Sequence, residues 1–267
     1  ERYQAGWSGA RFEELLRRLD VQAIAISTPN ALHAEQAVAA LEAGKHVLVQ
    51  KPVALSAADV ARVLDAARRA ARLLLVDYSY RYLATWQKLM ELLPAIGRVT
   101  AVRGAFHNIY GPGKAWFFDR SLSGGGALMD LGVHLLDLVL QAVRPARTQV
   151  QEATFGFERG YAVEDAARVR FACDGVPAEI EASWQAERTE TDIRLEVAGA
   201  RGTLVWRNIA GSFFHFRTEL DGLTQLDRET TLRADTLRIF RAAVAGEGAD
   251  PPDVRVYDLL AQAYDRA

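Results

Sequence analysis

The fold class of this chain is decided by the stretch His46-Val47-Leu48-Val49-Gln50-Lys51-Pro52. Residues 46–50 are predicted to form a strand with an apolar centre. Because Pro52 biases the preceding residue away from helical backbone, we expect Lys51 to extend the end of that strand. Ligands of parallel sheets bind at the carboxyl ends of strands, where a lysine amine can polarise a substrate oxygen. A solvated loop lysine fits the spacing about equally well, but only four of the 32 basic residues are lysines.

The segments around this strand alternate between helix and strand. Near-continuous apolar strands in such an alternation predict a parallel sheet covered on both faces. Asn30 is expected to cap the second helix, and Ser56 with Asp59 resembles a capping box that opens the third. The other expected elements are the helices 9–19 and 31–43 and the strands 21–27 and 73–77.

The pattern changes from about residue 98 onward. Short segments rich in alternating or β-branched residues are separated by turn signals, and this predicts a mostly antiparallel sheet. We therefore expect a parallel α/β half in residues 1–85 and an α+β half with an open sheet in residues 86–267. Its expected elements are the strands 98–109, 147–157, 163–173, 177–187, 192–198 and 202–207, and the helices 126–143, 231–245 and 254–266.

Composition excludes several classes of protein. The formal charge of −2 gives no basic field, so we expect no nucleic-acid partner. No uninterrupted apolar run has the length of a membrane span, so no membrane association is expected. Cys173 is the only cysteine, which excludes an internal disulfide and makes a thiolate metal site implausible. A single cysteine fits a reducing compartment, and we expect a cytoplasmic location.

Polar residues follow each strand of the predicted parallel sheet. They are the segments Ser27-Thr28-Pro29-Asn30, Gln50-Lys51-Pro52 and Ser79-Tyr80-Arg81. The carboxyl ends of parallel strands share one edge, so these groups are expected to line a crevice. Asn30 fits a plain helix cap nearly as well as a ligand contact, and both roles are compatible. His33 is expected in the first turn of its helix, where it faces the same crevice.

A second cluster lies in the predicted helix 126–143. Three glycines, residues 124–126, permit close backbone approach by a ligand or another segment. Asp130 and His134 are four residues apart, so on a helix the carboxylate can orient the imidazole as a general base. A surface pair is the commoner outcome of this spacing, and Asp137 shares the same face. Trp116 fits either core packing or contact with a cofactor ring, and no histidine spacing predicts a metal site.

Three motifs together give the chain its resemblance to a known family. They are residues 28–33, residues 41–52 and residues 124–134. In this order they resemble the glucose–fructose oxidoreductase and inositol dehydrogenase family of nicotinamide-dependent enzymes. The resemblance implies a Rossmann domain, a C-terminal α/β domain, NAD or NADP as cofactor, and a sugar, inositol or related polyol as substrate. A homo-oligomer, dimer or tetramer, through the C-terminal sheet is also implied.

The resemblance also implies roles for individual residues. Lys51, Asp130 and His134 match the catalytic lysine, aspartate and histidine of the family. The positions that line the nicotinamide half of the cofactor are matched by Thr28, Pro29, Asn30, His33, Gln50 and Arg81, together with Lys51. A non-catalytic sugar-binding relative and redox-assisted elimination or glycoside cleavage with a retained dinucleotide are the alternative functions.

Two departures from the family pattern stand out. Gln50 occupies a position that is usually glutamate, which removes a negative charge beside Lys51. The sequence also begins inside the Rossmann pattern, without the Gly-x-Gly-x-x-Gly turn and the acidic ribose-binding position. We expect a preceding segment of two βα units, each of ~30 residues.

Overall fold

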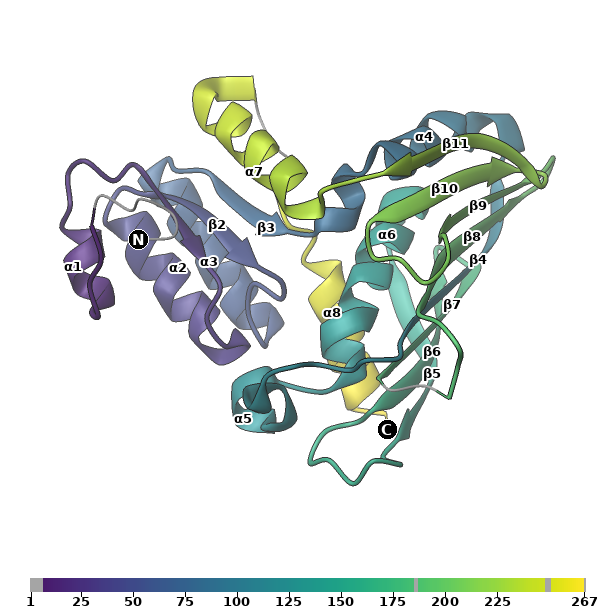
Figure 1. Cartoon of the computed structure of the whole chain (residues 1–267), viewed down its shortest axis with the longest axis horizontal. Helices are drawn as coiled ribbons and strands as arrows, with labels where there is room; N and C mark the ends of the chain where they lie inside the picture. Colours follow the sequence, from purple (N-terminus) through teal and green to yellow (C-terminus); the bar gives the residue numbers. More distant parts are fainter. Residues whose placement is uncertain (1–6, 185–186, 248–250, 267) are drawn as a thin grey trace.

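The computed structural model describes residues 7–184, 187–247 and 251–266, and it contains two separate sheets (Figure 1). The smaller sheet is parallel, as the sequence predicts. It consists of β1 (Ala23–Ile26), β2 (His46–Gln50) and β3 (Leu74–Asp77), with β2 in the middle. A short helix, α1 (Phe12–Leu16), precedes β1. The observed β2 has the predicted bounds.

Both faces of the smaller sheet are covered. Alternate strand residues such as Val47 and Val49 pack on one face with α2 (His33–Glu42) and α3 (Ala57–Ala70). On the other face Leu48 and Leu75 pack against Phe240 of the distant helix α7 (Leu232–Ala242). Figure 1 shows α7 between the two halves of the molecule. A helix near the end of the chain thus covers one face of a sheet that the beginning of the chain forms.

The helix caps follow the prediction in one case and not in the other. The Asp59 amide donates to Ser56 Oγ over 3.1 Å at the start of α3, a contact worth ~1 kcal/mol in helix stability. Asn30 caps no helix, so that prediction is wrong. It begins the 3-10 turn η1 (Asn30–Leu32), and its side chain bonds elsewhere.

The larger sheet has eight strands in the order β11-β10-β9-β8-β4-β7-β6-β5. Neighbours are antiparallel except β4 and β7, which run parallel. The strands are β4 (Val99–Asn108), β5 (Thr148–Gly156), β6 (Ala166–Cys173), β7 (Val176–Trp184), β8 (Asp192–Gly199), β9 (Thr203–Asn208), β10 (His215–Leu220) and β11 (Leu223–Glu229). The expected open, mostly antiparallel sheet is therefore confirmed.

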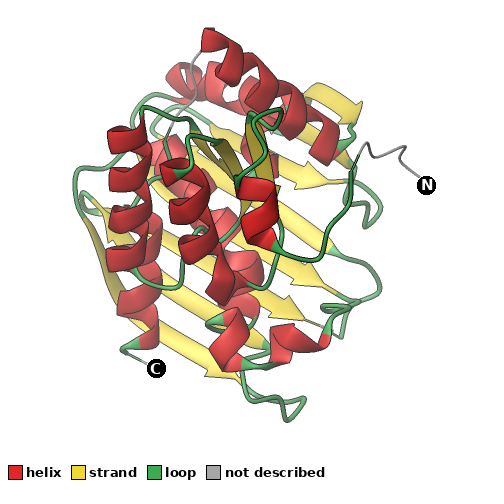
Figure 2. Ribbon diagram, turned by 90° about the vertical axis from the view of Figure 1, so that its left-hand side faces the viewer, coloured by secondary structure: helices red, strands yellow, loops and turns green. Residues whose placement is uncertain are grey.

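Helices cover one face of this sheet. The inner face packs against α6 (Val133–Val143) and α8 (Arg255–Tyr264), as Figures 1 and 2 show. The other face carries charged pairs, among them Arg168 with Glu179 and Arg207 with Glu219, each at 2.9 Å. Alternation of apolar and charged residues along each strand separates the two faces.

The sequence did not predict every element. The strands β10 and β11 were missed because polar and charged residues fill most of their positions, and β11 lies at the sheet edge. The helix α4 (Ala84–Leu92) was also missed; it packs its Trp86 against Trp206 of β9. The short helix α5 (Arg120–Ser123) and the predicted helix 126–143 form a nearly continuous unit. The latter begins with a π-helical turn over Leu128–Gly132 and continues as α6.

The segment Arg120–Val143 is long and apolar enough to cross a membrane, yet 83% of its most apolar stretch is buried against the rest of the chain. We therefore read it as a core helix of this fold.

Candidate active site

A crevice of about 700 Å³ lies at the carboxyl ends of the parallel strands, where the sequence predicts a ligand site. Loop 112–117 and helix α7 close its other sides. The residues that line it are Ala25, Ile26, Ser27, Thr28, Asn30, His33, Leu48, Gln50, Lys51, Asp77, Pro112, Gly113, Lys114, Trp116, Phe117, Asp130, Thr236 and Leu237. Its volume is within the range of small-molecule and cofactor sites.

Lys51 and Asp130 join the two halves of the molecule inside this crevice. Lys51 Nζ lies 2.6 Å from Asp130 Oδ1 and 2.6 Å from the Asp130 backbone oxygen. Asp130 Oδ2 accepts a hydrogen bond of 3.0 Å from Nε1 of Trp184, at the end of β7. The Lys51 and Asp130 side chains are 13% and 15% exposed, so water screens the ion pair only partly. The peptide bond between Lys51 and Pro52 is cis.

His134 lies in a second cavity of about 660 Å³ that adjoins the crevice. This cavity is lined by Gln50, Asp77, Ser79, Tyr80, His134, Phe213, Phe214, Thr230 and Thr231. Burial, reinforced by the charge of Lys51, holds the pKa of His134 well below its ordinary range. The imidazole is therefore neutral at pH 7, and within the described chain its Nδ1 is buried without a hydrogen-bond partner. A neutral imidazole is the form that accepts a proton.

The expected contact between Asp130 and His134 does not form. Asp130 is held by Lys51 and Trp184, and no hydrogen bond joins it to the imidazole. The backbone over residues 128–132 is π-helical, so a spacing of four does not stack the two side chains as it does in an α-helix. Asp137, which shares the predicted face, pairs with Arg81.

Gln50 and Asp77 line both cavities and form the boundary between them. Gln50 Nε2 donates a hydrogen bond to Asp77 Oδ2. The hydroxyls of Ser79 and Thr236 donate to Asp77 Oδ1 over 2.6 and 2.8 Å. The sequence interpretation missed Asp77, although its position as the last residue of a predicted buried strand was a usable signal.

Several residues that the sequence assigned to the cofactor do line the crevice: Thr28, Asn30, His33, Gln50, Lys51 and Trp116. Two of them also connect neighbouring segments. Asn30 Nδ2 donates to the backbone oxygen of Ser123 over 2.9 Å. His33 is buried between the backbone oxygens of Pro52 and Thr28, at 2.7 and 2.8 Å. Burial lowers the pKa of His33, so the neutral ring donates to only one of these two oxygens.

Arg81 and Pro29, which the sequence also assigned to the cofactor, line neither of these two cavities. Arg81 is paired with Asp137 of α6, and the two side chains are 6% and 2% exposed. The guanidinium also lies over the Tyr78 ring. An arginine buried in this way has its donors committed to the protein core. Pro29 precedes η1, where its backbone oxygen accepts from the Leu32 amide.

Close backbone packing positions the helix that carries Asp130 and His134. A Cβ atom on Gly126 would lie 1.8 Å from the backbone oxygen of Glu164, so only glycine fits. Glu164 then satisfies the first amides of the helix: its backbone oxygen accepts from Ala127 and its Oε1 from Leu128. The glycines at 124–126 thus allow close approach of another segment of the chain. This is one of the two interpretations that the sequence offered; the other was close approach of a ligand.

The crevice fits a nicotinamide. It offers the indole face of Trp116, the amide groups of Asn30 and Gln50, and the hydroxyl of Thr28 within one cavity. An aromatic face and a few convergent polar groups are the usual lining of a cofactor site. In the described part of the chain no group of three or more His, Cys, Asp or Glu side chains is placed to hold a metal ion.

Comparisons with known proteins agree with this geometry. Residues 3–78 match a family model described as an oxidoreductase family with an NAD-binding Rossmann fold. Residues 86–205 match the model of the GFO/IDH/MocA C-terminal domain. The chain is 32% identical over 256 residues to the 1,5-anhydro-D-fructose reductase of Ensifer adhaerens, which covers 91% of this chain and 75% of that protein. The chain belongs to the Gfo/Idh/MocA family of oxidoreductases.

Other members of the Gfo/Idh/MocA family are also similar. The dTDP-3,4-didehydro-2,6-dideoxy-alpha-D-glucose 3-reductase of Streptomyces violaceoruber is 40% identical over 129 residues, 48% of this chain and 37% of that protein. The crystal structure of an oxidoreductase domain protein from Kribbella flavida has a TM-score of 0.81 at 26% identity and covers 96% of this chain and 81% of that one. The family is NAD-dependent and acts on sugars, which agrees with the cofactor that the sequence implies.

Proposed function

We propose that this protein is a dehydrogenase or reductase that interconverts a hydroxyl and a carbonyl group of a sugar or related polyol, with NAD or NADP as cofactor. The cofactor occupies the crevice at the carboxyl ends of β1–β3, and the sugar occupies the adjoining cavity that holds His134. The single observation that carries the proposal is the Lys51–Asp130 pair, in the crevice next to a neutral histidine.

The chain's own residues supply the proton chemistry. When bound, the nicotinamide supplies hydride transfer to and from the sugar carbon. His134 accepts the proton of the sugar hydroxyl in oxidation and returns it in reduction. Lys51 has three N–H donors, and Asp130 takes two of them, which leaves one for the sugar oxygen. Asp130 therefore positions Lys51 rather than His134.

The test is a substitution of His134. We expect His134→Ala to lower kcat by ~10²–10⁴ with NAD affinity unchanged, because general acid–base assistance is lost while the crevice is intact. Activity is followed as absorbance at 340 nm with 1,5-anhydrofructose, aldohexoses and inositols, and dinucleotide affinity as the nicotinamide fluorescence of NADH. Normal turnover by His134→Ala would remove this residue from the mechanism. A dinucleotide retained through purification, with no net change at 340 nm during turnover, would indicate redox-assisted elimination or glycoside cleavage instead.

We also propose that the protein is a homo-oligomer that assembles through the open face of its larger sheet and works in the cytoplasm. Support for assembly is the outer face of that sheet, where arginine and glutamate side chains alternate and can pair between copies as they do within one. Light scattering of the purified protein at two salt concentrations tests it, because such contacts weaken with ionic strength.

A further inference from the structure

The cavity that holds His134 has a distinctive charge. Of its nine lining residues Asp77 is the only carboxylate, and none is lysine or arginine. His134 contributes no charge at pH 7, because burial keeps it neutral. The lining of this cavity in the described chain therefore carries one negative charge, that of Asp77.

The Asp77 side chain is buried in the wall of the cavity and is held there by hydrogen bonds. The residue is 5% exposed, and its partners in the described part of the chain are the uncharged Gln50, Ser79 and Thr236. All three partners donate to its oxygens, which act as acceptors. Among the described side chains no cation pairs with Asp77, and a buried carboxylate of this kind repels a second anion strongly because little water screens the interaction.

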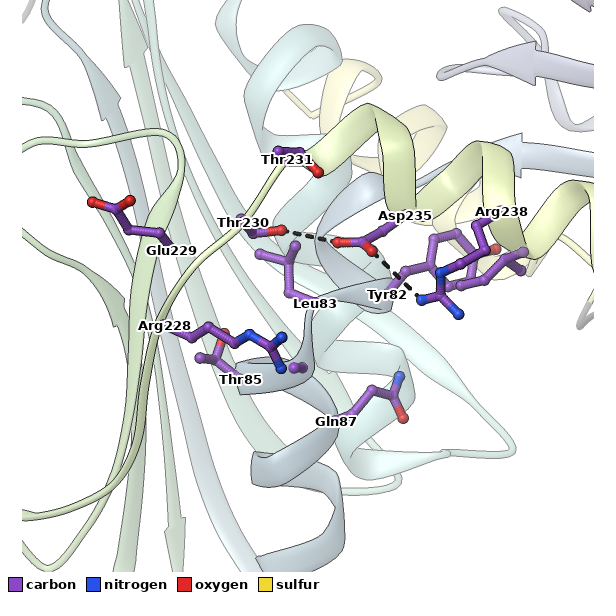
Figure 3. A pocket seen from close by; sticks show the side chains of 12 residues that line it. Tyr82, Leu83, Thr85, Gln87, Arg228, Glu229, Thr230, Thr231, Asp235 and Arg238 are labelled. Atoms are coloured by element: carbon purple, nitrogen blue, oxygen red, sulfur yellow. Dashed lines mark hydrogen bonds and ion pairs between the residues drawn. The ribbon is translucent and has the colours of Figure 1, made fainter.

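The nearby cations whose side chains the structure describes are Lys51, Arg228 and Arg238, and none of them pairs with Asp77. Lys51 is balanced by Asp130, at 2.6 Å. Arg228 and Arg238 lie in a separate groove that shares only Thr230 and Thr231 with the cavity. Figure 3 shows that groove, in which Asp235 accepts from Thr230 and pairs with Arg238. The segment 230–231 thus separates the two arginines from the cavity.

The remaining lining suits an uncharged sugar ring. Tyr80, Phe213 and Phe214 supply aromatic surface, and Phe214 is 55% exposed at the outside. The C–H face of a pyranose or inositol ring is apolar and packs on such rings. Gln50, Ser79, Thr230 and Thr231 supply neutral polar groups for hydroxyls.

We propose that Asp77 makes this site selective for uncharged sugars and against sugars that carry a phosphate, carboxylate or nucleotidyl group. The inference rests on the proposed function and narrows its substrate class. It separates this chain from relatives that are named for a substrate with a diphosphate, such as the Streptomyces violaceoruber reductase of a dTDP-sugar, and groups it with the 1,5-anhydro-D-fructose reductase.

The experiment compares sugars that have the same shape and different charge. D-glucuronamide and D-glucuronate differ by one charge, and D-glucose with D-glucosamine extends the series to a cation. Each is assayed for NAD reduction at 340 nm and for binding by calorimetry. Because like charges brought together repel each other, we expect the amide to be preferred over the carboxylate by at least ~10-fold in kcat/KM and in Kd. D-glucosamine is expected to bind at least as well as D-glucose.

The second arm assigns the preference to Asp77. Asp77→Asn keeps the size of the side chain and removes the charge, so it should raise the kcat/KM for D-glucuronate relative to D-glucuronamide by ~10-fold. Asp258→Asn, on an exposed turn of α8, removes the same charge elsewhere and should leave the ratio unchanged. If Asp77→Asn fails to fold, the wild-type comparison still decides the charge preference.

The outcomes are distinguishable. Equal or better use of D-glucuronate than D-glucuronamide by the wild type overturns the inference and leaves the proposed function standing. A preference for the amide that Asp77→Asn does not change overturns the role of Asp77. Absence of both binding and turnover for these sugars, anhydrosugars and inositols overturns the proposed function and the inference with it.

Discussion

Lys51 Nζ lies 2.6 Å from both the side-chain and the backbone oxygen of Asp130, across the boundary between the two sheets. Lys51 comes from the end of β2, and Asp130 comes from the π-helical turn that precedes α6. The two contacts fix the amine in direction as well as in distance. Lys51, the lysine that we propose to be catalytic, is thus oriented by the other half of the molecule, and the geometry of the site depends on how the halves pack.

Asp130→Asn is the first prediction. The substitution removes the charge and leaves the backbone contact, so Lys51 is held less firmly. Because a displacement of ~1 Å can cost ~10² in rate, we expect kcat to fall by about that factor while NAD affinity is nearly unchanged. Steady-state kinetics with a dinucleotide titration measure both. Wild-type kcat in this variant contradicts the positioning role.

The Arg81–Asp137 pair is predicted to stabilise the fold and not to bind the cofactor. Truncating one partner leaves a buried charge, so Arg81→Ala should lower the free energy of unfolding by ~3–5 kcal/mol. The double variant Arg81→Met with Asp137→Leu should lose much less. Urea denaturation measures both, and nicotinamide fluorescence is the second readout. If Arg81→Ala has normal stability and binds the dinucleotide weakly, the result contradicts this prediction and supports a role of Arg81 in cofactor binding.

Two tyrosines of α8 are predicted to hold the catalytic segments. Tyr257 Oη accepts from the Val53 amide over 2.9 Å, beside the loop of Lys51, and Tyr264 donates to Glu164 over 2.8 Å. Tyr257→Phe leaves the buried Val53 amide without an acceptor, which should cost ~1–3 kcal/mol of stability. Tyr110→Phe is the matched control, because Tyr110 is 71% exposed. Equal thermal midpoints for the two variants contradict the prediction.

The free energy of unfolding is predicted to decrease as the pH is lowered from about 6.5, the ordinary pKa of histidine. The reason is that His134 and His33 both have lowered pKa values in the folded state. As the pH falls from the unfolded pKa toward the folded one, the unfolded chain gains protons that the folded chain does not. Each such histidine then lowers the free energy of unfolding by ~1.4 kcal/mol per pH unit.

His134→Asn tests this origin of the acid sensitivity. Urea midpoints of the wild type and the variant, measured from pH 7.5 to 5.5, should differ in their slopes, with the variant less sensitive to acid. Parallel slopes would mean that folding leaves the pKa of His134 unchanged, which contradicts the lowered pKa on which the acid sensitivity rests.

Much of the fold could be predicted from the sequence because the patterns that indicate it lie within short segments. The strand 46–50 is a contiguous run, and Ser56 with Asp59 is a cap within four residues. The edge strand β11 was not predicted because its largely exposed residues lack the apolar alternation that marks a strand, and β10 was not predicted because most of its residues are polar or charged.

The site was only partly readable, because its decisive contacts join distant residues. Asp77 meets Gln50 and Thr236, which are 27 and 159 positions away. The contact of Lys51 with Asp130 was not predicted, and neither was the π-helical turn that separates Asp130 from His134. Arg81 was assigned to the cofactor by motif position, while its actual partner Asp137 is 56 residues away.

The most direct test of the central claim is the rate of NAD reduction at 340 nm by an uncharged sugar, compared between Lys51→Gln and Lys88→Gln. Lys88 is a lysine of α4 that pairs with Glu91 on the surface, so it is a matched control. We expect a loss of ~10²–10⁴ in kcat for Lys51→Gln alone, with dinucleotide affinity retained. Equal rates for the two variants would contradict it.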